Sequence, residues 1–410
     1  MTTIAAAIYL AIVLSAALGI YLKWRQGVAA IAHRERVPAE FSQRITLDEH
    51  RRAADYTVAS MKLTSLEAAF DAILAIAWLG FWLAPLYGLL AQFIAPGLSL
   101  SVAVVAAVAV VDYLLHLPFA LAEAFGLEAR FGFNRATPGM FIRDRLKGGA
   151  LWLMFVAPLL YGLFLLLREA PNSWWLWAFF ASMALMAGII VIYPSFIAPL
   201  FNTFTPLKDQ SLKARMEALL AQCGFESDGL FVMDASTRST HGNAYFSGLG
   251  KAKRIVFFDT LLQQHTPDEI LSILAHELGH YKFGHVRQRL LQAGVLIFVL
   301  FAVLRWAFAP GGLPSRFGLP DDPGVALVIV LTASASILHL LSPLTNWLSR
   351  RAEFQADRFA KGIFGKEPMI SALAKLSRDN LSTLTPDVLY ALFYYSHPPV
   401  PLRIAALDRD

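Results

Sequence analysis

Two histidines lie four residues apart in the segment His276–Glu277–Leu278–Gly279–His280, and a glutamate directly follows the first of them. If the segment is helical, His276 and His280 share one face, and both imidazoles can reach a single Zn²⁺. Zn²⁺ lowers the pKa of a water towards about 7 and polarises a carbonyl, and a neighbouring carboxylate such as Glu277 can move the proton. These residues therefore fit peptide hydrolysis. Two surface histidines on a soluble helix would have the same spacing.

The residues before this segment predict the helix that must carry it. Thr266 can cap the helix, Pro267 suits its first position, and Glu269 stands three residues after the threonine, which makes a capping box. Ile270 and Ile273 then begin an apolar face that leads into the two histidines. The motif is thus expected within a well-capped helix.

A catalytic zinc needs a third protein ligand, and the segment Ser349–Asp357 offers two carboxylates. Glu353 and Asp357 are four residues apart and share a helix face. One carboxylate could complete a site of two histidines and one acid, and the other could orient a ligand histidine. Alternatively, the two acids could form ion pairs with Arg350 or Arg351. The need for a third zinc ligand favours a role of these acids in metal binding.

Three more polar residues could serve such a site. His285 stands nine residues after His276, so it is expected on the opposite face of the same helix, in a structural role. His397 is followed by two prolines that would hold it rigidly, and Arg403 could pair with acidic residues. His397 could donate a hydrogen bond to an oxyanion, and Arg403 could bind a carboxylate of the site. Alternatively, both residues belong to an ordinary surface turn.

The composition predicts that these elements sit in a membrane protein. Of the 410 residues 57% are hydrophobic and only 16% are charged, whereas a soluble domain has about 25% charged residues. The net charge of +5, without basic residues clustered beside exposed aromatics, argues against nucleic-acid binding. Seven stretches reach or nearly reach the length of about 20 residues that crosses a bilayer. They are residues 2–22, 72–95, 99–122, 148–167, 174–200, 290–308 and 324–348.

Loop charges predict the orientation of these spans. Basic residues gather between Lys23 and Lys62 and between Arg130 and Lys147, whereas the alternate loops carry few. By the positive-inside rule the basic loops are cytoplasmic, and so are residues 205–286 and 350–410. Ionisable residues within or beside the spans should face protein or a watery cavity; they are Asp71, Asp112, His116, Glu123, Arg305 and His339. Asp112 and His116 share a helix face, either as a hydrogen-bonded pair or as part of a chamber wall.

Residues 205–265 no longer look like membrane spans. Residues 211–223 read as an amphipathic helix, and residues 230–233, 243–246 and 254–258 read as short strands. We therefore expect an N-terminal membrane region of five spans, residues 1–204. A zinc peptidase region, residues 205–410, would contain the spans at 290–308 and 324–348 and the C-terminal segment.

The whole sequence resembles the type I CAAX prenyl endopeptidases, membrane zinc proteases of the gluzincin group. The resemblance rests on Phe131–Asn134, Pro199–Leu207, Asn243–Phe246, Lys253–Leu261, His276–His280, Ser349–Asp357 and Ser396–Pro399. It implies a mostly α-helical, polytopic protein. Seven transmembrane helices would form a barrel around a water-filled chamber, with a small α/β zinc metalloprotease domain on the cytoplasmic side.

The resemblance also implies roles for individual residues. One Zn²⁺ per chain would be bound by His276, His280 and Glu353, with Glu277 as general base. Asp357 would support a ligand from outside the coordination sphere, His397 would steady the oxyanion, and Arg403 would support the site. Asn243 and Ala244 would lie on an edge strand that pairs with the substrate backbone.

The expected partners are membrane lipid and a peptide or protein substrate, which could be lipidated or membrane-inserted. The short, Ala-rich chain ends in Asp408-Arg409-Asp410 without an ER retrieval signal, which favours a bacterial inner membrane with a cytoplasmic site; in a eukaryote the ER membrane would be expected. Quality control of membrane proteins and processing of a native peptide are then alternative functions to CAAX cleavage.

Two other interpretations can be weighed against this one. In a transport or lipid-handling chamber the zinc would be structural and held by four ligands, commonly including cysteine. The only cysteine, Cys223, lies outside both metal segments, and Glu277 would have no use there. A smaller membrane stress protease would have fewer spans than the seven expected here.

Overall fold

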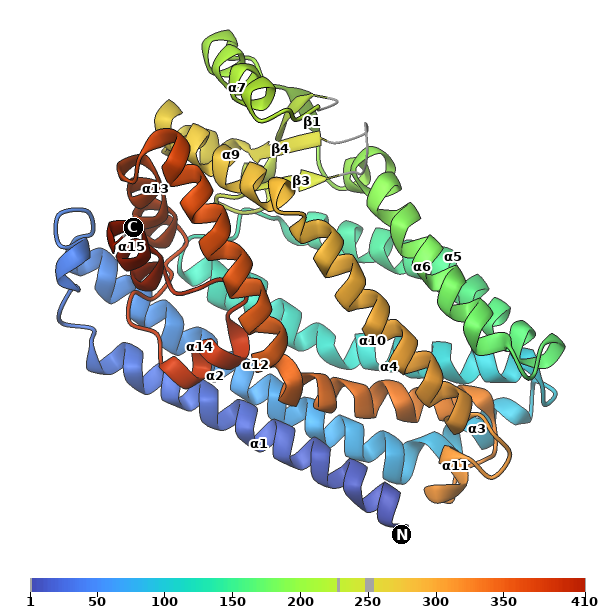
Figure 1. The fold of residues 1–410 in the computed structure, drawn as a ribbon. Helices are drawn as coiled ribbons and strands as arrows, with labels where there is room; N and C mark the ends of the chain where they lie inside the picture. The colour runs from blue at the N-terminus through green and yellow to red at the C-terminus, as the bar shows by residue number, and fades with distance from the viewer. Residues whose placement is uncertain (1, 227–228, 248–253, 410) are drawn as a thin grey trace.

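The computed structural model describes residues 2–226, 229–247 and 254–409, so Lys253 of one quoted motif lies outside it. Seven of its helices are long and apolar enough to cross a membrane, as expected (Figure 1). They are α1 Thr3–Ala32, α2 Leu47–Ala77 with its continuation α3 Leu83–Ala91, α4 Leu98–Leu121, α5 Pro138–Glu169, α6 Trp174–Ile192, α10 His285–Ala307 and α12 Pro323–Phe364. π-helical turns join α2 to α3 and extend α4 to Glu128.

The outer faces of these helices are apolar. Leu14, Phe81 and Phe180 are exposed, each by more than half of its surface, whereas Leu79 and Leu100 are buried in a cluster between helices. Exposed apolar area on this scale marks a surface that something other than water must cover. Together with the helix lengths it identifies the bundle as a membrane domain.

Two of the seven helices are about twice as long as the bilayer requires. The helix from Leu47 to Ala91 has 45 residues and α12 has 42, so each is about 65 Å long, roughly twice the hydrocarbon thickness. The sequence prediction began the second span at residue 72 and treated residues 23–62 as a loop. That part is largely helical because it packs on C-terminal elements: Phe41 and Leu373 lie in one buried cluster.

A four-stranded sheet lies at one end of the long helices, and α3, α11 and the N-terminus lie at the other (Figure 1). The strands are β1 Phe204–Pro206, β2 Leu230–Met233, β3 Ala244–Ser247 and β4 Arg254–Phe258, in the order β1-β2-β4-β3. Strands β2 and β4 are parallel and the other pairs are antiparallel. Two strands and helix α7, Gln210–Gln222, agree with the prediction, and β3 begins one residue later than predicted.

Helix α9, Pro267–Lys282, begins as predicted. The Thr266 side chain accepts from the Glu269 amide and the Glu269 side chain accepts from the Thr266 amide, which completes the capping box. Glu269 also accepts hydrogen bonds from Ser371 and Lys375 of α13, Glu367–Asp379. The remaining helices are α8 Asp259–Gln264, α11 Leu313–Arg316, α14 Val388–Tyr394 and α15 Val400–Arg409. The start of α9 is therefore anchored both locally and by the C-terminal region.

Helices α9 and α12 are in close backbone contact at Gly279. A Cβ atom added there would lie only 2.9 Å from Cα of Ala356, which is fully buried. Because that neighbour is backbone, it cannot swing aside as a flexible side chain could. The glycine between the two histidines therefore sets how near the two helices come.

We expect Gly279→Ala to push α9 away from α12 and to destabilise the protein by about 1–3 kcal/mol, as overpacking does. The thermal unfolding midpoint in detergent and the metal content of the purified protein should both fall. Gly362→Ala on α12 is the matched control, since a Cβ there meets nothing within 4 Å. Equal midpoints for the two variants would show that the close approach is not critical.

Several ionisable residues of the spans surround a cavity of about 410 Å³ between α1, α2, α4 and α12. His116 contacts Asp71 of α2 at 2.7 Å, and the indole of Trp78 donates to Asp112. Asp112 and His116 thus form hydrogen bonds to a neighbouring helix and also line a cavity. Hydrogen bonding between helices and a place in a cavity wall, the two alternatives from the sequence, therefore both apply. His339 reaches the same cavity from α12.

Candidate metal centre

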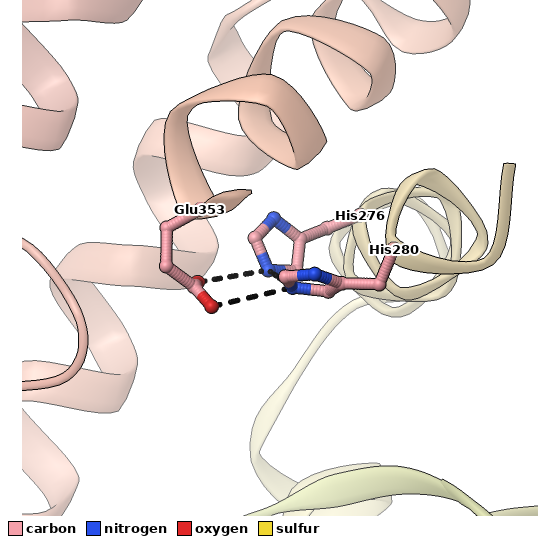
Figure 2. Close-up of side chains that lie close together, drawn as sticks. All are labelled: His276, His280 and Glu353. Carbon is pink, nitrogen blue, oxygen red and sulfur yellow. Dashed lines mark hydrogen bonds and ion pairs between the residues drawn. The ribbon is translucent and has the colours of Figure 1, made fainter. Parts of the chain in front are cut away.

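Three potential metal donors converge between α9 and α12. Figure 2 shows the imidazoles of His276 and His280 facing the carboxylate of Glu353. The two Nε2 atoms are 3.2 Å apart, and each lies 3.3 Å from an oxygen of Glu353. Two ligands about 2.05 Å from a tetrahedral Zn²⁺ lie about 3.3 Å from each other. The donor set therefore already has the spacing of a zinc site.

Burial gives a second test of this fit. Glu353 is 0% exposed, and neither carboxylate oxygen accepts a well-formed hydrogen bond within the described part of the chain. A buried carboxylate left in this state is costly unless positive charge lies nearby. Burial alone would lower the pKa of His276, but contacts with Asp357 and Glu353 raise it to about 9. A metal cation would supply the positive charge that the two acids attract.

His276 is oriented by two residues behind it. Its Nδ1 lies 2.8 Å from Asp357, which is also bound in a bidentate manner by Arg403 at 2.6 and 2.8 Å. All three side chains are buried. We assign the proton to Nδ1, because the carboxylate can only accept, and this directs the Nε2 lone pair at the metal position. Arg403 therefore fixes the position of Asp357, and Asp357 in turn fixes the orientation of the His276 imidazole.

His280 is oriented by a different chain of contacts. His285 Nε2 lies 2.8 Å from the amide oxygen of Gln355, and His285 Nδ1 lies 2.9 Å from Nδ1 of His280. If His285 donates to Gln355, its Nδ1 accepts the proton of His280, which leaves Nε2 of His280 for a metal. Thus α12 supports both histidines.

The expected position of His285 was wrong. Helix α9 ends at Lys282, and Gly284, with φ of 67°, turns the chain so that His285 starts α10. It therefore faces His280 instead of the far side of α9. The glycine just before it was the sequence signal of this break. His285 is not among the three converging donors, so the expectation of a structural role stays open.

Glu277 lies beside the donors in a half-buried position. Burial raises its pKa, and the nearby His276 and His280 oppose that rise. Burial increases the affinity of this carboxylate for a proton, and the nearby histidines limit that increase. Glu277 is therefore suited to accept a proton from water and to release it again.

Two more side chains reach the same space from other elements. Nε2 of His397 lies 3.4 Å from Glu353, and its side chain is 61% exposed, so it can still turn towards a ligand. Arg289, on α10, places Nη2 3.9 Å from the same Glu353 oxygen. The sequence interpretation missed Arg289, because nothing in its spacing relates it to the metal segments.

Strand β3 forms an edge of the sheet, with its outer side unpaired within the described residues. Ala244 is its first residue, and the carbonyl of Asn243 just before it accepts from the Phe258 amide at 2.9 Å. The approach to the strand is fixed by Asn380, whose amide accepts from Gly242 N at 3.3 Å and donates to Gly242 O at 3.4 Å. The edge is thus held ready to pair with another extended chain.

A network ties this strand to the membrane helices. His241 contacts Asn380 at 3.0 Å and Glu128 at 3.1 Å, and its ring stacks on Phe133 with centroids 4.0 Å apart. The Tyr56 hydroxyl donates to the same Glu128 at 2.6 Å. Burial would lower the pKa of His241, but Glu128 raises it above the ordinary value. The Phe131–Asn134 motif thus helps to join the bundle to the edge strand.

Comparisons with known proteins agree over almost the whole chain. Residues 28–203 match the family model described as CAAX prenyl protease N-terminal, five membrane helices, and residues 206–410 match that of peptidase family M48. A CAAX prenyl protease 1 homolog of Oryza sativa subsp. japonica is 39% identical over 75% of this chain and 73% of its own. CAAX prenyl protease 1 of Saccharomyces cerevisiae is 36% identical over 72% of this chain and 69% of its own. The crystal structure of S. mikatae Ste24p is similar with a TM-score of 0.91 and 26% identity, over 100% of this chain and 99% of that one.

Proposed function

Because this chain belongs to peptidase family M48 and has the membrane region of the CAAX prenyl proteases, we propose that it hydrolyses peptide bonds with one Zn²⁺ bound by His276, His280 and Glu353. Membership makes it a multi-pass membrane metalloprotease with a peptide or protein substrate, and it confirms the resemblance and the fold class predicted from sequence. The observation that carries the zinc proposal is the separation of about 3.3 Å between the three buried donors.

The residues around the donors suggest a division of labour. When bound, Zn²⁺ would polarise the scissile carbonyl and make a water more acidic. Glu277 would take the proton of that water and pass it to the leaving amine. His397 would donate a hydrogen bond to the oxyanion, and Asp357 with Arg403 would keep His276 aligned. The edge of β3, with Asn243 and Ala244, would hold the substrate backbone.

The number of donors favours catalysis over a structural zinc. Among the described residues the group contains three donors, and a closed structural site would need four. The remaining tetrahedral position is then available to water or substrate. The Glu277 carboxylate beside it would have no function in a structural or transport site.

Removal of the metal is the first test of this function. We expect a chelator to abolish cleavage of unstructured peptides by the purified protein, and stoichiometric Zn²⁺ to restore it, because the carbonyl and the water would lose their common Lewis acid. Metal content should be measured on the same samples. Full cleavage by protein shown to contain no metal would contradict the proposal.

The proposal extends to the membrane and the substrate. The basic residues at the sheet end of the bundle support a cytoplasmic site by the positive-inside rule. We propose a bacterial inner membrane for this chain, or the ER membrane in a eukaryote. CAAX proteins are candidate substrates because the relatives are named CAAX prenyl proteases, and misfolded membrane proteins are the alternative. Proteomics of cells that carry Glu277→Gln would distinguish them, since a trapped substrate remains bound.

A further inference from the structure

The histidine just before the edge strand forms contacts through both of its ring nitrogens. Nδ1 of His241 lies 3.0 Å from Oδ1 of Asn380, and Nε2 lies 3.1 Å from Oε2 of Glu128. Asn380 follows the last residue of α13, whereas Glu128 ends the π-helical extension of α4. The ring therefore bridges the C-terminal region and the membrane bundle.

Both partners present acceptors to this ring. The amide of Asn380 is oriented by Gly242, because its Oδ1 accepts from Gly242 N and its Nδ2 donates to Gly242 O. The same Oδ1 faces His241 Nδ1, so this nitrogen must carry a proton. At Glu128, Oε1 accepts from the Tyr56 hydroxyl at 2.6 Å, a hydrogen bond that favours the charged carboxylate. Its Oε2 can then only accept, so His241 Nε2 must carry a proton as well.

The surroundings stabilise the resulting imidazolium. Its ring is stacked on Phe133 with centroids 4.0 Å apart, and the face of an aromatic ring attracts a cation. Burial alone would lower the pKa of His241, but the bonds to Glu128 and Asn380 raise it above the ordinary value. Glu128 is the only ion-pair partner of His241 among the described residues. The other charged groups on the elements packed around the ring are engaged elsewhere or exposed: Arg52 binds the Phe131 carbonyl, Arg378 pairs with Asp379, Asp259 accepts from Ser236, and Glu123 is exposed.

The backbone around His241 is fixed at the start of the edge strand. Gly242, which follows it, is buried and is held at both its N–H and its carbonyl by Asn380. The carbonyl of His241 accepts from the Thr260 hydroxyl at 2.9 Å. Leu381, next to Asn380, has a φ of 47°, the only positive φ of a non-glycine among the described residues. Such a strained conformation persists only where the surrounding structure enforces it, so Asn380 has little freedom to move.

Loss of one proton would break this arrangement. A neutral ring donates from one nitrogen only, so the other nitrogen would direct its lone pair at an oxygen of Glu128 or Asn380. A half-buried acceptor that faces another acceptor loses its hydrogen bond and is repelled. Because Asn380 also binds Gly242, the displacement would reach the strand that Asn243 and Ala244 offer to a substrate.

We propose that the imidazolium of His241 is a positioning group, which holds β3 where Asn243 and Ala244 pair with the substrate backbone and releases the strand when it loses a proton. The inference rests on the proposed peptidase function. Positioning is complete below the ordinary pKa of histidine, about 6.5, and is lost as the pH rises through the raised pKa of His241. Substrate binding therefore weakens at alkaline pH for a reason separate from the chemistry at the metal.

The test measures peptide binding by the full-length, metal-loaded Glu277→Gln protein in detergent, in which the proposed base cannot titrate. The probe is a labelled, unstructured peptide with blocked termini and no ionisable side chain, chosen from those that the wild-type protein cleaves. Between about pH 6 and about pH 9 we expect the dissociation constant to rise about tenfold, the effect of one lost hydrogen bond to a charged group. Amide hydrogen exchange in residues 241–245, corrected for the intrinsic rate at each pH, should accelerate over the same range, because the strand is released.

Glu128→Gln, made in the same background, is the decisive variant. Its amide nitrogen can donate to the lone pair on Nε2 of a neutral His241 while its oxygen still accepts from Tyr56, so the neutral ring is satisfied. We expect a flat pH profile and, at about pH 9, binding about tenfold tighter than with Glu128 in place. His241→Asn, whose side chain is too short to reach Glu128, should give a flat profile at the weak level. A folding defect cannot strengthen binding at high pH.

Glu123→Gln is the matched control, because Glu123 is exposed on the same π-helical extension and forms no hydrogen bond with His241. Its profile should keep the pH dependence. A dissociation constant that does not change with pH, the same dependence in Glu128→Gln, or a flat profile in Glu123→Gln overturns the positioning role and leaves the peptidase function intact. If the wild-type protein cleaves no peptide and the Glu277→Gln protein binds none, the proposed function itself fails and the role of His241 fails with it.

Discussion

Replacement of Glu277 by glutamine is expected to lower kcat by about 100- to 10,000-fold while the protein keeps its bound metal. The side chain lies beside the donors but is not one of the three that converge, so its loss should leave the metal bound. Glutamine has nearly the same shape but cannot take up a proton, and general-base catalysis typically contributes a factor of 10² to 10⁴. Single-turnover cleavage together with metal analysis of the same preparation measures both effects.

The control is a glutamate of similar chemistry away from the centre. Glu217 is exposed on α7 and forms a surface pair with Lys213 at 3.8 Å, so Glu217→Gln should cleave at the wild-type rate. Undiminished cleavage by Glu277→Gln would rule out its role as the base. Loss of zinc together with activity would instead indicate that Glu277 supports the metal.

Glu353→Gln should remove the metal itself. Its carboxylate is fully buried and lies 3.3 Å from Nε2 of both His276 and His280. An amide in its place keeps the volume but loses the negative charge that binds a divalent cation and attracts protons to His276. We expect the affinity for Zn²⁺ to fall by more than about 100-fold, since even partners outside the coordination sphere contribute 10- to 100-fold. Zinc content after equilibration with a metal buffer reports this directly.

Asp357→Asn provides the graded comparison for this prediction. Asp357 supports Nδ1 of His276 and does not face the metal position, so its variant should weaken zinc binding only about 10- to 100-fold. The order wild type, Asp357→Asn, Glu353→Gln is the expected result. Stoichiometric zinc in Glu353→Gln would mean that the third ligand is another group.

Local patterns of the chain were informative wherever helix geometry alone decides the arrangement. A spacing of four residues places His276 beside His280, and Glu353 on the same face as Asp357, whatever the rest of the molecule does. The capping box at Thr266 and the seven apolar spans are local in the same sense, and both occur in the structure. Such features follow from covalent geometry and hydrogen bonding within a few residues.

Long-range contacts could not be inferred in this way. From the residues alone either acid of the Ser349–Asp357 segment could have been the third donor, and only the resemblance to a family favoured Glu353. The structure brings Glu353 to the histidines and leaves Asp357 behind His276, because Gly279 lets α9 approach the backbone of Ala356. A shift of α12 along its axis by about 6 Å, the rise over four residues, would exchange the two acids, because they share a face but lie at different heights. No spacing in the sequence records that register.

The same distinction explains what was missed. His285 was assigned to the wrong helix face because the pattern continued α9 through Gly284, where the chain in fact turns. The cavity beside His397 joins residues from Gln26 to Val400, which no periodicity connects. The sequence by itself determined the number of spans, the two helical pairs of ligating residue types and the chemistry they allow. Tertiary packing decided which carboxylate faces the histidines, what orients each imidazole, and which surface a substrate can touch, because these depend on how distant helices are positioned against one another.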